Sequence, residues 1–347
     1  MTGLIDLVAE SHIIVCCGSG GVGKTTTAAA IAIRGAQLGR NTVVVTIDPA
    51  KRLADALGLG TTGLTNQPQL VAGEWPGELH AMMLDTKQTF DELVTRYAAT
   101  PQQAAAIHTN TFYRNISGSL GGTQEYMAAE KLYQLAVESD FDLVVIDTPP
   151  SRNALEFLDA PERLSAFLNH RLYRVLMAPS RLSMKIIGAA AQTFFRQITK
   201  VVGASVIDDA MKFFEAFDGM EDGFRDRATQ TQTLLKRPST AFVLITTPRA
   251  DAVVEAEFFA AELANRTTQV AALIINRMLP QYPAVKSGPA ALRANLDEFR
   301  RAAEREESNV GPLLVACPRA AVSRVPLMAA DVHDLAGLQT VSASLFG

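Results

Sequence analysis

An eight-residue segment near the N-terminus constrains the fold more than any other part of the chain. It reads Gly18, Ser19, Gly20, Gly21, Val22, Gly23, Lys24 and Thr25. An apolar run typical of a buried strand precedes it, and a helical pattern over residues 25–38 follows it. The pattern G-x-x-x-x-G-K-[ST] in that context predicts a P-loop, in which glycines let backbone N–H groups surround phosphate oxygens at a helix N-terminus.

Short runs rich in Val and Ile recur along the chain without polar alternation, which is typical of strands buried on both faces of a parallel sheet. Helical patterns follow several of them, as in βα repeats with right-handed crossovers. We therefore expect an α/β fold with a doubly wound, mostly parallel sheet. The expected strands are residues 12–17, 42–47, 79–84, 143–146, 242–246, 270–275 and 313–316.

Two long stretches have helical patterns and little strand character. One covers residues 86–137, and the other lies between the fourth and fifth expected strands. We expect a P-loop domain over residues 1–85, 138–158 and 236–347, with an inserted all-helical subdomain over residues 86–137 and 159–235. The helices expected in the second stretch are residues 153–158, 161–177, 184–201, 207–217 and 224–235.

Three polar residues complete the expected phosphate site. Lys24 is placed to neutralise phosphate oxygens, and the Thr25 hydroxyl is placed to ligate Mg²⁺. Asp147 ends an apolar run at residues 143–146, where a carboxylate either holds Mg²⁺ or caps the following turn. Together with the P-loop, it favours the metal role. The sequence therefore predicts Mg²⁺ and a nucleotide as ligands.

Two further residues lie where expected strands end. Asp48 follows residues 42–47, where it can either orient the attacking water or cap the helix after it, and the residues alone leave both open. Asn276 follows residues 270–275 and is placed to hydrogen-bond a base. A guanine-specific loop reads [N/T]-K-x-D, but Asn276 is followed by Arg277, Met278 and Leu279. The missing aspartate favours ATP over GTP.

Charge and cysteine content limit the partners and the compartment. The formal net charge is -4, which gives no overall basic field for nucleic acid or anionic lipid. Three cysteines occur, Cys16, Cys17 and Cys317, without a C-x-x-C pair. The first ten residues lack the pattern of a signal peptide, and no long uncharged apolar stretch occurs. We expect a reduced, cytoplasmic protein, with a peripheral location at a membrane as the alternative.

The motifs together resemble those of the ArsA-type ATPases, the family of the arsenical-pump-driving ATPase and of the guided-entry ATPase that delivers tail-anchored membrane proteins. The resemblance covers most of the chain and is closest to actinobacterial ArsA-like ATPases. Its motifs are C-G-S-G-G-V-G-K-T-T at residues 17–26, T-I-D-P-A-K-R-L at 46–53, G-T-Q-E-Y-M at 122–127, D-T-P-P-S-R-N-A-L-E-F-L at 147–158 and V-P-L-M-A-A-D-V-H-D-L-A-G-L at 325–338.

The resemblance implies roles for individual residues. Asp48 is expected to activate water, Asp147 to act as the Mg²⁺-linked carboxylate, and Thr26 to lie near the α-phosphate. Asn276 is expected at adenine. The family also implies a P-loop of the deviant Walker A class and a dimer that closes over two nucleotides while its helical subdomains rearrange. That dimer is either a homodimer or a heterodimer with an ArsA-like paralogue.

The chain departs from the family at several positions. Ser19 stands where the family usually has a lysine that reaches the nucleotide of the opposite subunit, so hydrolysis is expected to be slow or dependent on a partner. The arsenic-binding cysteines and the zinc-binding C-x-x-C pair have no counterparts among three scattered cysteines. These absences argue against arsenite as a ligand and against a structural zinc.

Met and Phe side chains are concentrated in the second helical stretch. They either build the core of the subdomain or line a groove for a hydrophobic client or membrane protein. The residues concerned are Met177, Met184, Ile187, Phe194, Phe195, Ile198, Met211, Phe213, Phe214, Phe217 and Met220. Three functions follow as hypotheses: an ATP-driven dimeric switch, a weakly hydrolysing subunit of a heteromeric complex, and a P-loop kinase acting on a metabolite.

Overall fold

The computed structural model describes residues 3–47, 52–59, 63–117, 123–149, 156–169, 204–285, 287, 289–329, 331–332 and 334–347. The chain forms two compact units. The first, here called the α/β unit, consists of Met1–Leu84, Gln134–Leu155 and Lys236–Gly347. The second, here called the helical unit, consists of Asp85–Tyr133 and Glu156–Leu235.

The described part of the α/β unit contains an eight-stranded sheet in the order β3-β4-β2-β5-β1-β6-β7-β8. Neighbouring strands are parallel except β3 and β4, which are antiparallel. The predicted doubly wound, mostly parallel sheet is thus confirmed. The strands are β1 (Ile13–Cys17), β2 (Asn41–Thr46), β3 (Gln69–Leu70), β4 (Glu78–Met83), β5 (Leu143–Asp147), β6 (Thr240–Thr246), β7 (Val270–Met278) and β8 (Ala321–Pro326).

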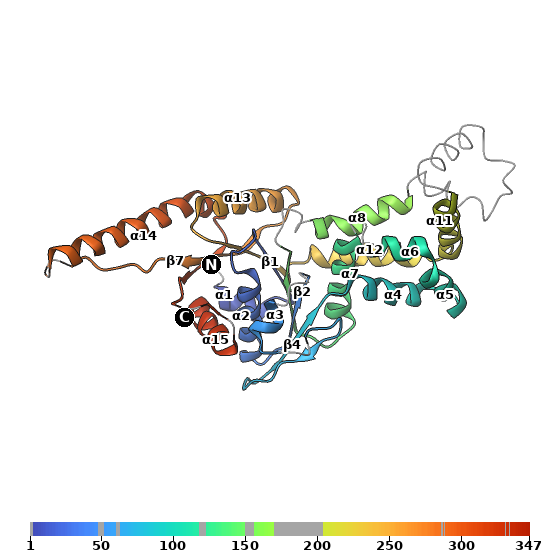
Figure 1. Ribbon diagram of the computed structural model, residues 1–347, viewed down its shortest axis with the longest axis horizontal. Helices are drawn as coiled ribbons and strands as arrows, with labels where there is room; N and C mark the ends of the chain where they lie inside the picture. Colours follow the sequence, from blue (N-terminus) through green and yellow to red (C-terminus); the bar gives the residue numbers. More distant parts are fainter. Residues whose placement is uncertain are drawn as a thin grey trace. The chain divides into compact units, whose positions relative to one another are not determined.

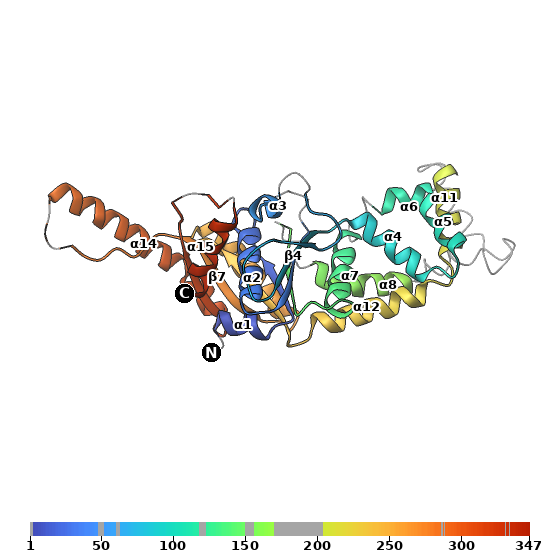
Figure 2. The same cartoon turned by 90° about the horizontal axis from the view of Figure 1, so that it is seen from below.

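Helices cover both faces of this sheet (Figures 1 and 2). The helix α2 (Lys24–Gln37) packs its alanines against Ile14 and Cys16 of β1, because small side chains let the helix approach the strand closely. Beside α2 lie α1 (Leu4–Glu10), α3 (Arg52–Ala56) and α15 (Leu335–Phe346). On the opposite face lies α13 (Ala250–Asn265), which packs against α14 (Ala290–Ala316).

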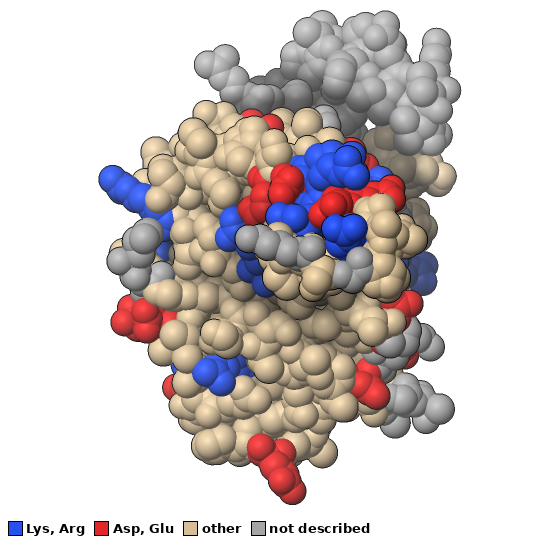
Figure 3. All heavy atoms as spheres, turned by 90° about the vertical axis from the view of Figure 1, so that its left-hand side faces the viewer, with Lys and Arg blue, Asp and Glu red and all other residues tan. Residues whose placement is uncertain are grey.

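The N-terminal part of α14 extends beyond the sheet, as Figures 1 and 2 show. Leu292 and Phe299 are exposed there, and the ring of Phe299 lies 5.9 Å from that of Tyr282. Figure 3 shows the side of the molecule from which α14 projects, and its basic and acidic side chains are interspersed. Among the residues of this face that the structure describes, the basic side chains lie beside acidic ones and form no continuous basic surface.

Two element predictions are wrong. Residues 313–316 belong to the end of α14, not to a strand, and the last strand is β8. Leu313 is buried and Val315 is 80% exposed, which is the pattern of a helix with one buried face. The helices predicted at 153–158 and 161–177 are one helix in the described region, α8 (Glu156–Asn169), which contains Pro161.

The helical unit has a core of aromatic side chains contributed by five helices. Tyr113 and Phe224 are fully buried, and Phe213, Phe217 and Met220 are nearly so. In the described part of the chain no helix is both long and apolar enough to cross a membrane. The helices are α4 (Thr86–Tyr97), α5 (Pro101–Thr109), α6 (Thr111–Ile116), α7 (Thr123–Val137), α8, α11 (Ala204–Phe217) and α12 (Glu221–Leu235).

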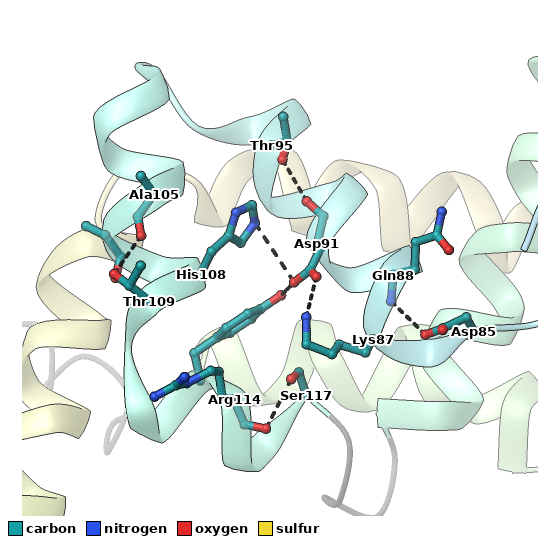
Figure 4. A network of polar contacts seen from close by, with 12 residues as sticks. Asp85, Lys87, Gln88, Asp91, Thr95, Ala105, His108, Thr109, Arg114 and Ser117 are labelled. Atoms are coloured by element: carbon teal, nitrogen blue, oxygen red, sulfur yellow. Dashed lines mark hydrogen bonds and ion pairs between the residues drawn. The ribbon is translucent and has the colours of Figure 1, made fainter.

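Asp91 joins two helices of this unit (Figure 4). Its carboxylate accepts hydrogen bonds from Lys87 Nζ and from the hydroxyl of Tyr113, both at 2.6 Å. Burial, and then the hydrogen bond to Asp91, raises the pKa of Tyr113 above its usual value. The phenol therefore stays protonated and continues to donate, which fixes α6 against α4.

A buried ion pair joins α7 to α12. Arg227 Nε lies 3.0 Å from Glu130 Oε2, and the two side chains are 5% and 0% exposed. The guanidinium of Arg227 also stacks over the ring of Tyr133 at 4.1 Å from its centroid. A charge so deeply buried is tolerated only when it is paired, so the two helices depend on each other at this point.

Candidate functional site

The loop between β1 and α2 has the backbone of a phosphate cradle. Gly18 has φ +153° and Gly23 has φ +95°, conformations that favour glycine. A Cβ atom would overlap the Ile245 carbonyl oxygen at Gly18 and the Asn276 side-chain nitrogen at Gly23. Both glycines are therefore required by close approach of neighbouring strands as well as by backbone conformation. The first turn of α2 begins directly after the loop, at Lys24.

The side chain of Asp147 meets the loop at the carboxyl end of β5. Its Oδ2 atom accepts hydrogen bonds from Thr25 Oγ1 at 2.7 Å and from Thr46 Oγ1 at 3.1 Å. The register places Asp147 beside Cys16 of β1 and Thr46 of β2. The strands β5 and β2 and the first turn of α2 thus bring one carboxylate and two hydroxyls together, and these are the oxygen ligands that Mg²⁺ prefers.

Lys24 is almost fully buried at the start of α2. Its ammonium donates a 2.8 Å hydrogen bond to the carbonyl oxygen of Ser19, five residues earlier. The side chain therefore folds back over the loop and holds the loop in its curved form. Ser19 itself is partly exposed, and its backbone, not its hydroxyl, accepts this bond.

The cysteines below the loop are inert packing residues. Burial, and then the charge of Asp147, raises the pKa of Cys16, and burial raises the pKa of Cys17 to about 12. Both thiols are free and lie fully inside β1. A neutral, buried thiol is a poor nucleophile and a poor metal ligand, so these cysteines take no part in the chemistry of the site.

Asn276 and Arg277 hold the outer part of the loop. Asn276 Nδ2 donates to the carbonyl oxygen of Val22 at 2.8 Å, and Arg277 Nη1 donates to that of Gly21 at 3.2 Å. The end of β7 is thereby fastened to the P-loop. Asn276 also lines the cavity described next, where the sequence predicts contact with a base.

A cavity of about 670 Å³ opens over the loop. Its lining includes predicted site residues: Gly21, Gly23, Lys24, Thr25, Thr26 and Asn276. It also includes residues that were not predicted: Arg52, Asp55 and Ala56 of α3, Thr148, Arg277, Val325 and Pro326 at the end of β8, and Leu327, Met328, Asp331 and Val332 after β8. The structure therefore brings the P-loop, the end of β7 and the end of β8 to one cavity.

Asp48 lies outside the described residues, as do Pro49, Ala50 and Lys51. The last described residue of that segment, Ile47, donates its backbone N–H to the carbonyl oxygen of Asp147 at 3.1 Å. The catalytic role of Asp48 stays a prediction. Among the Met and Phe residues of the second helical stretch, those between 177 and 198 also lie outside the described residues.

The family model for anion-transporting ATPases matches residues 11–347. The chain belongs to this ATPase family. The match begins just before β1 and continues through α15, so it includes the P-loop, Asp147 and the segment after β8. The predicted ArsA-type membership is confirmed, and closeness to actinobacterial members stays a prediction.

Three curated relatives illustrate the similarity. The chain is 27% identical to the ATPase GET3B of Arabidopsis thaliana, over 76% of this chain and 63% of the relative. It is 27% identical to the ATPase ASNA1 homolog of Babesia bovis, over 76% and 65%. It is 24% identical to the ATPase GET3 of Malassezia globosa, over 78% and 73%. The matched region thus spans just under two thirds of the first two relatives.

Proposed function

We propose that this chain binds Mg-ATP in the cavity over the P-loop and hydrolyses it. The observation that carries the proposal is the meeting of Thr25 and Asp147 at 2.7 Å directly below the loop that Lys24 holds. An added Cβ atom would lie in close contact with neighbouring atoms at Gly18 and at Gly23, which supports a loop that binds phosphate through its backbone.

The donor set of the site fits both ligands. The hydroxyl of Thr25 and the carboxylate of Asp147 would hold Mg²⁺, and Lys24 would leave the Ser19 carbonyl oxygen to neutralise phosphate oxygens. Bound Mg²⁺ would offset the charge that develops on those oxygens. Thr26 lies in the cavity lining, which supports its predicted place near the α-phosphate, and Asp48 follows a strand that ends beside Asp147.

The test is binding and turnover measured on the same preparation. Isothermal titration with ATP, with and without Mg²⁺, and phosphate release at saturating ATP would be compared for the wild type and for Lys24→Ala. We expect Mg²⁺-dependent binding and measurable release by the wild type, and loss of both in Lys24→Ala. Phosphate transfer from ATP to a metabolite, without release to water, would instead favour the kinase hypothesis.

We also propose that ATP binding changes the shape of a dimer, and that the helical unit engages an apolar segment of a partner protein. The helical unit contains a groove of about 360 Å³ with a mainly apolar lining, which supports this second part. Phe214 and Phe167, the latter 50% exposed, lie in that lining, whereas Phe213 and Phe217 also belong to the core of the unit.

Replacement of one groove residue separates the partner role from ATP hydrolysis. Phe167→Glu places a charge in the apolar lining, and Val206→Glu, on another exposed position of the helical unit, is the matched control. We expect Phe167→Glu alone to abolish co-purification of an apolar partner in ATP, with phosphate release unchanged. Equal recovery by all forms, or equal recovery in ATP, ADP and no nucleotide, would contradict the proposal.

A further inference from the structure

The strand β7 leaves its regular pairing at Asn276 and Arg277. Ile275 pairs with Arg324, and the next pair is Met278 with Pro326. The chain thus advances by three residues on β7 but by only two on β8. Such a bulge turns a side chain away from its normal direction and is common beside active sites.

Arg277 has a backbone conformation that non-glycine residues rarely adopt, with φ +61°. The side-chain oxygen of Asn276 accepts the N–H of Arg277 at 2.9 Å and stabilises this conformation. This backbone conformation is unfavourable for a residue with a side chain, and residues held in such conformations concentrate at binding sites. The bulge and the hydrogen bond therefore set the direction of one particular side chain, that of Arg277.

That side chain reaches the rim of the P-loop. Arg277 Nη1 donates to the carbonyl oxygen of Gly21 at 3.2 Å, and the side chain is exposed and lines the cavity. A guanidinium has donors to spare after one hydrogen bond, and its flat faces stay open to an aromatic ring. Lys24, by contrast, is buried beneath the loop, so Lys24 and Arg277 act at different depths of the cavity, whose lining also includes Arg52.

The end of β8 and the segment after it contribute apolar groups to the same cavity. Its lining includes Val325 and Pro326 of β8 and then Leu327 and Met328, and Leu327 N donates to the carbonyl oxygen of Met278 at 2.8 Å. This segment is thus fixed to β7 just beyond Arg277. A flat aromatic base suits a site that offers a guanidinium face and apolar side chains, although Asp55 and Asp331 also line the cavity.

We propose that Arg277 binds the base of the nucleotide by stacking its guanidinium on the ring, while its hydrogen bond to Gly21 keeps it in place. The inference rests on the proposed function, because it assumes that the cavity takes a nucleotide. Stacking contacts the face of a base, not its edge. Arg277 therefore adds affinity for adenine and guanine alike, and selection between them falls to other groups.

Titration calorimetry with two ligands tests the inference, since tripolyphosphate carries the phosphates of ATP without its base. Arg277→Met keeps most of the side-chain length and removes the planar cation. We expect it to weaken ATP and GTP binding about tenfold each and to leave tripolyphosphate binding within about twofold of wild type. Arg277→Lys should bind ATP and GTP with affinities between those of Arg277→Met and the wild type. Arg319 is an exposed arginine outside the cavity, so Arg319→Met should bind all these ligands as the wild type does.

The outcomes distinguish this inference from the proposed function. If the wild type binds both ligands and Arg277→Met binds ATP as tightly as the wild type does, the inference alone is overturned. An equal loss of ATP and tripolyphosphate affinity would also overturn it, because Arg277 would then act on the phosphates or on the P-loop through its hydrogen bond to Gly21. Failure of the wild type to bind either ligand would overturn the proposed function and the inference with it. Retained tripolyphosphate binding shows that the variant has folded around its P-loop.

Discussion

The hydroxyl of Thr25 donates a 2.7 Å hydrogen bond to Oδ2 of Asp147, although 122 residues separate them in the chain. Thr25 lies in the first turn of α2 and Asp147 is the last residue of β5, so the contact exists only when β1 and β5 are paired in their observed register. The sheet thereby brings together, at the base of the P-loop, the two residues that we propose to hold Mg²⁺. Disturbing this pair is the most direct test of the site.

Asp147→Asn should abolish the advantage that Mg²⁺ gives to nucleotide binding. The amide is nearly the same size as the carboxylate and still accepts from Thr25, but it carries no charge to hold a divalent cation. We expect phosphate release to fall about 100-fold or more, and ATP affinity to become independent of Mg²⁺. The matched control is Asp140→Asn, an exposed position before β5. Full Mg²⁺ dependence in Asp147→Asn would contradict the assignment.

Ser19→Lys should raise the rate of ATP hydrolysis. The serine side chain is partly exposed and its backbone carbonyl already accepts from Lys24, so a longer side chain can extend from the loop without displacing that bond. A lysine at position 19 would add a second cation to the loop, besides Lys24, and could stabilise the charge of the transition state. We expect the rate of ATP hydrolysis to increase about tenfold or more. Phosphate release at saturating ATP measures it.

Ser19→Met separates charge from bulk at this position, because methionine is unbranched and uncharged. We expect Ser19→Met to hydrolyse ATP at the wild-type rate or more slowly. The same gain in both variants would mean that the loop responds to side-chain length and not to charge. Absence of any gain in Ser19→Lys, alone or mixed with wild type, would remove the basis for a partner-dependent turnover.

The cysteines should resist alkylation in the native protein. Burial raises the pKa of Cys17 to about 12 and also raises those of Cys16 and Cys317, so the thiols stay protonated at pH 8. Iodoacetamide at that pH should modify Cys16 and Cys17 at least about 100-fold more slowly in the native protein than in urea, as measured by mass spectrometry of peptides. Rapid native modification would show that β1 is not buried.

The same shifts give a pH dependence of stability. Unfolded thiols ionise near pH 8.5, whereas the folded pKa values are higher, so the unfolded chain loses protons first as pH rises. The contribution of the buried thiols to the free energy of unfolding is therefore fully present below about pH 8.5 and is lost progressively as the pH rises towards 12. Cys17→Ala should have a smaller loss of stability over this window than the wild type in urea titrations.

The sequence predicts the centre of the sheet well and its edge poorly, for one physical reason. Central strands such as β1 and β5 are buried on both faces and so appear as continuous apolar runs. The edge strand β8 is buried at only one of six positions, Val325, and its sequence contains Ser and Arg. The apolar residues 313–316 resemble a buried strand more closely, although they end α14.

That error explains what was missed in the cavity. Once β8 is placed at the sheet edge, Pro326 and the residues after it follow a strand end, where ligand sites of such sheets lie. The P-loop and Asp147 are predicted without knowing the position of β8, because the motif locates the P-loop and the apolar strand pattern locates Asp147. The role of Arg277 has no sequence signal, since the bulge that directs its side chain depends on the pairing of β7 with β8.

The ion pair between Glu130 and Arg227 should be essential for the stability of the helical unit. Glu130→Gln removes one charge and leaves the other buried without a full partner, which costs about 3 kcal/mol. Hydrogen exchange followed by mass spectrometry should therefore show faster exchange in α7 and α12, while exchange in β1 and β5 stays at its wild-type rate. The local comparison is needed because the chain has two compact units.

The double variant Glu130→Leu with Arg227→Met is the matched control for this prediction. It removes both charges and keeps an unbranched side chain that can still pack over Tyr133. Replacing a whole buried pair by apolar groups is often close to neutral, so we expect most of the protection in α7 and α12 to return. Protection in Glu130→Gln equal to that of the wild type, or a double variant that exchanges faster than the single one, would contradict the mutual dependence of the two helices.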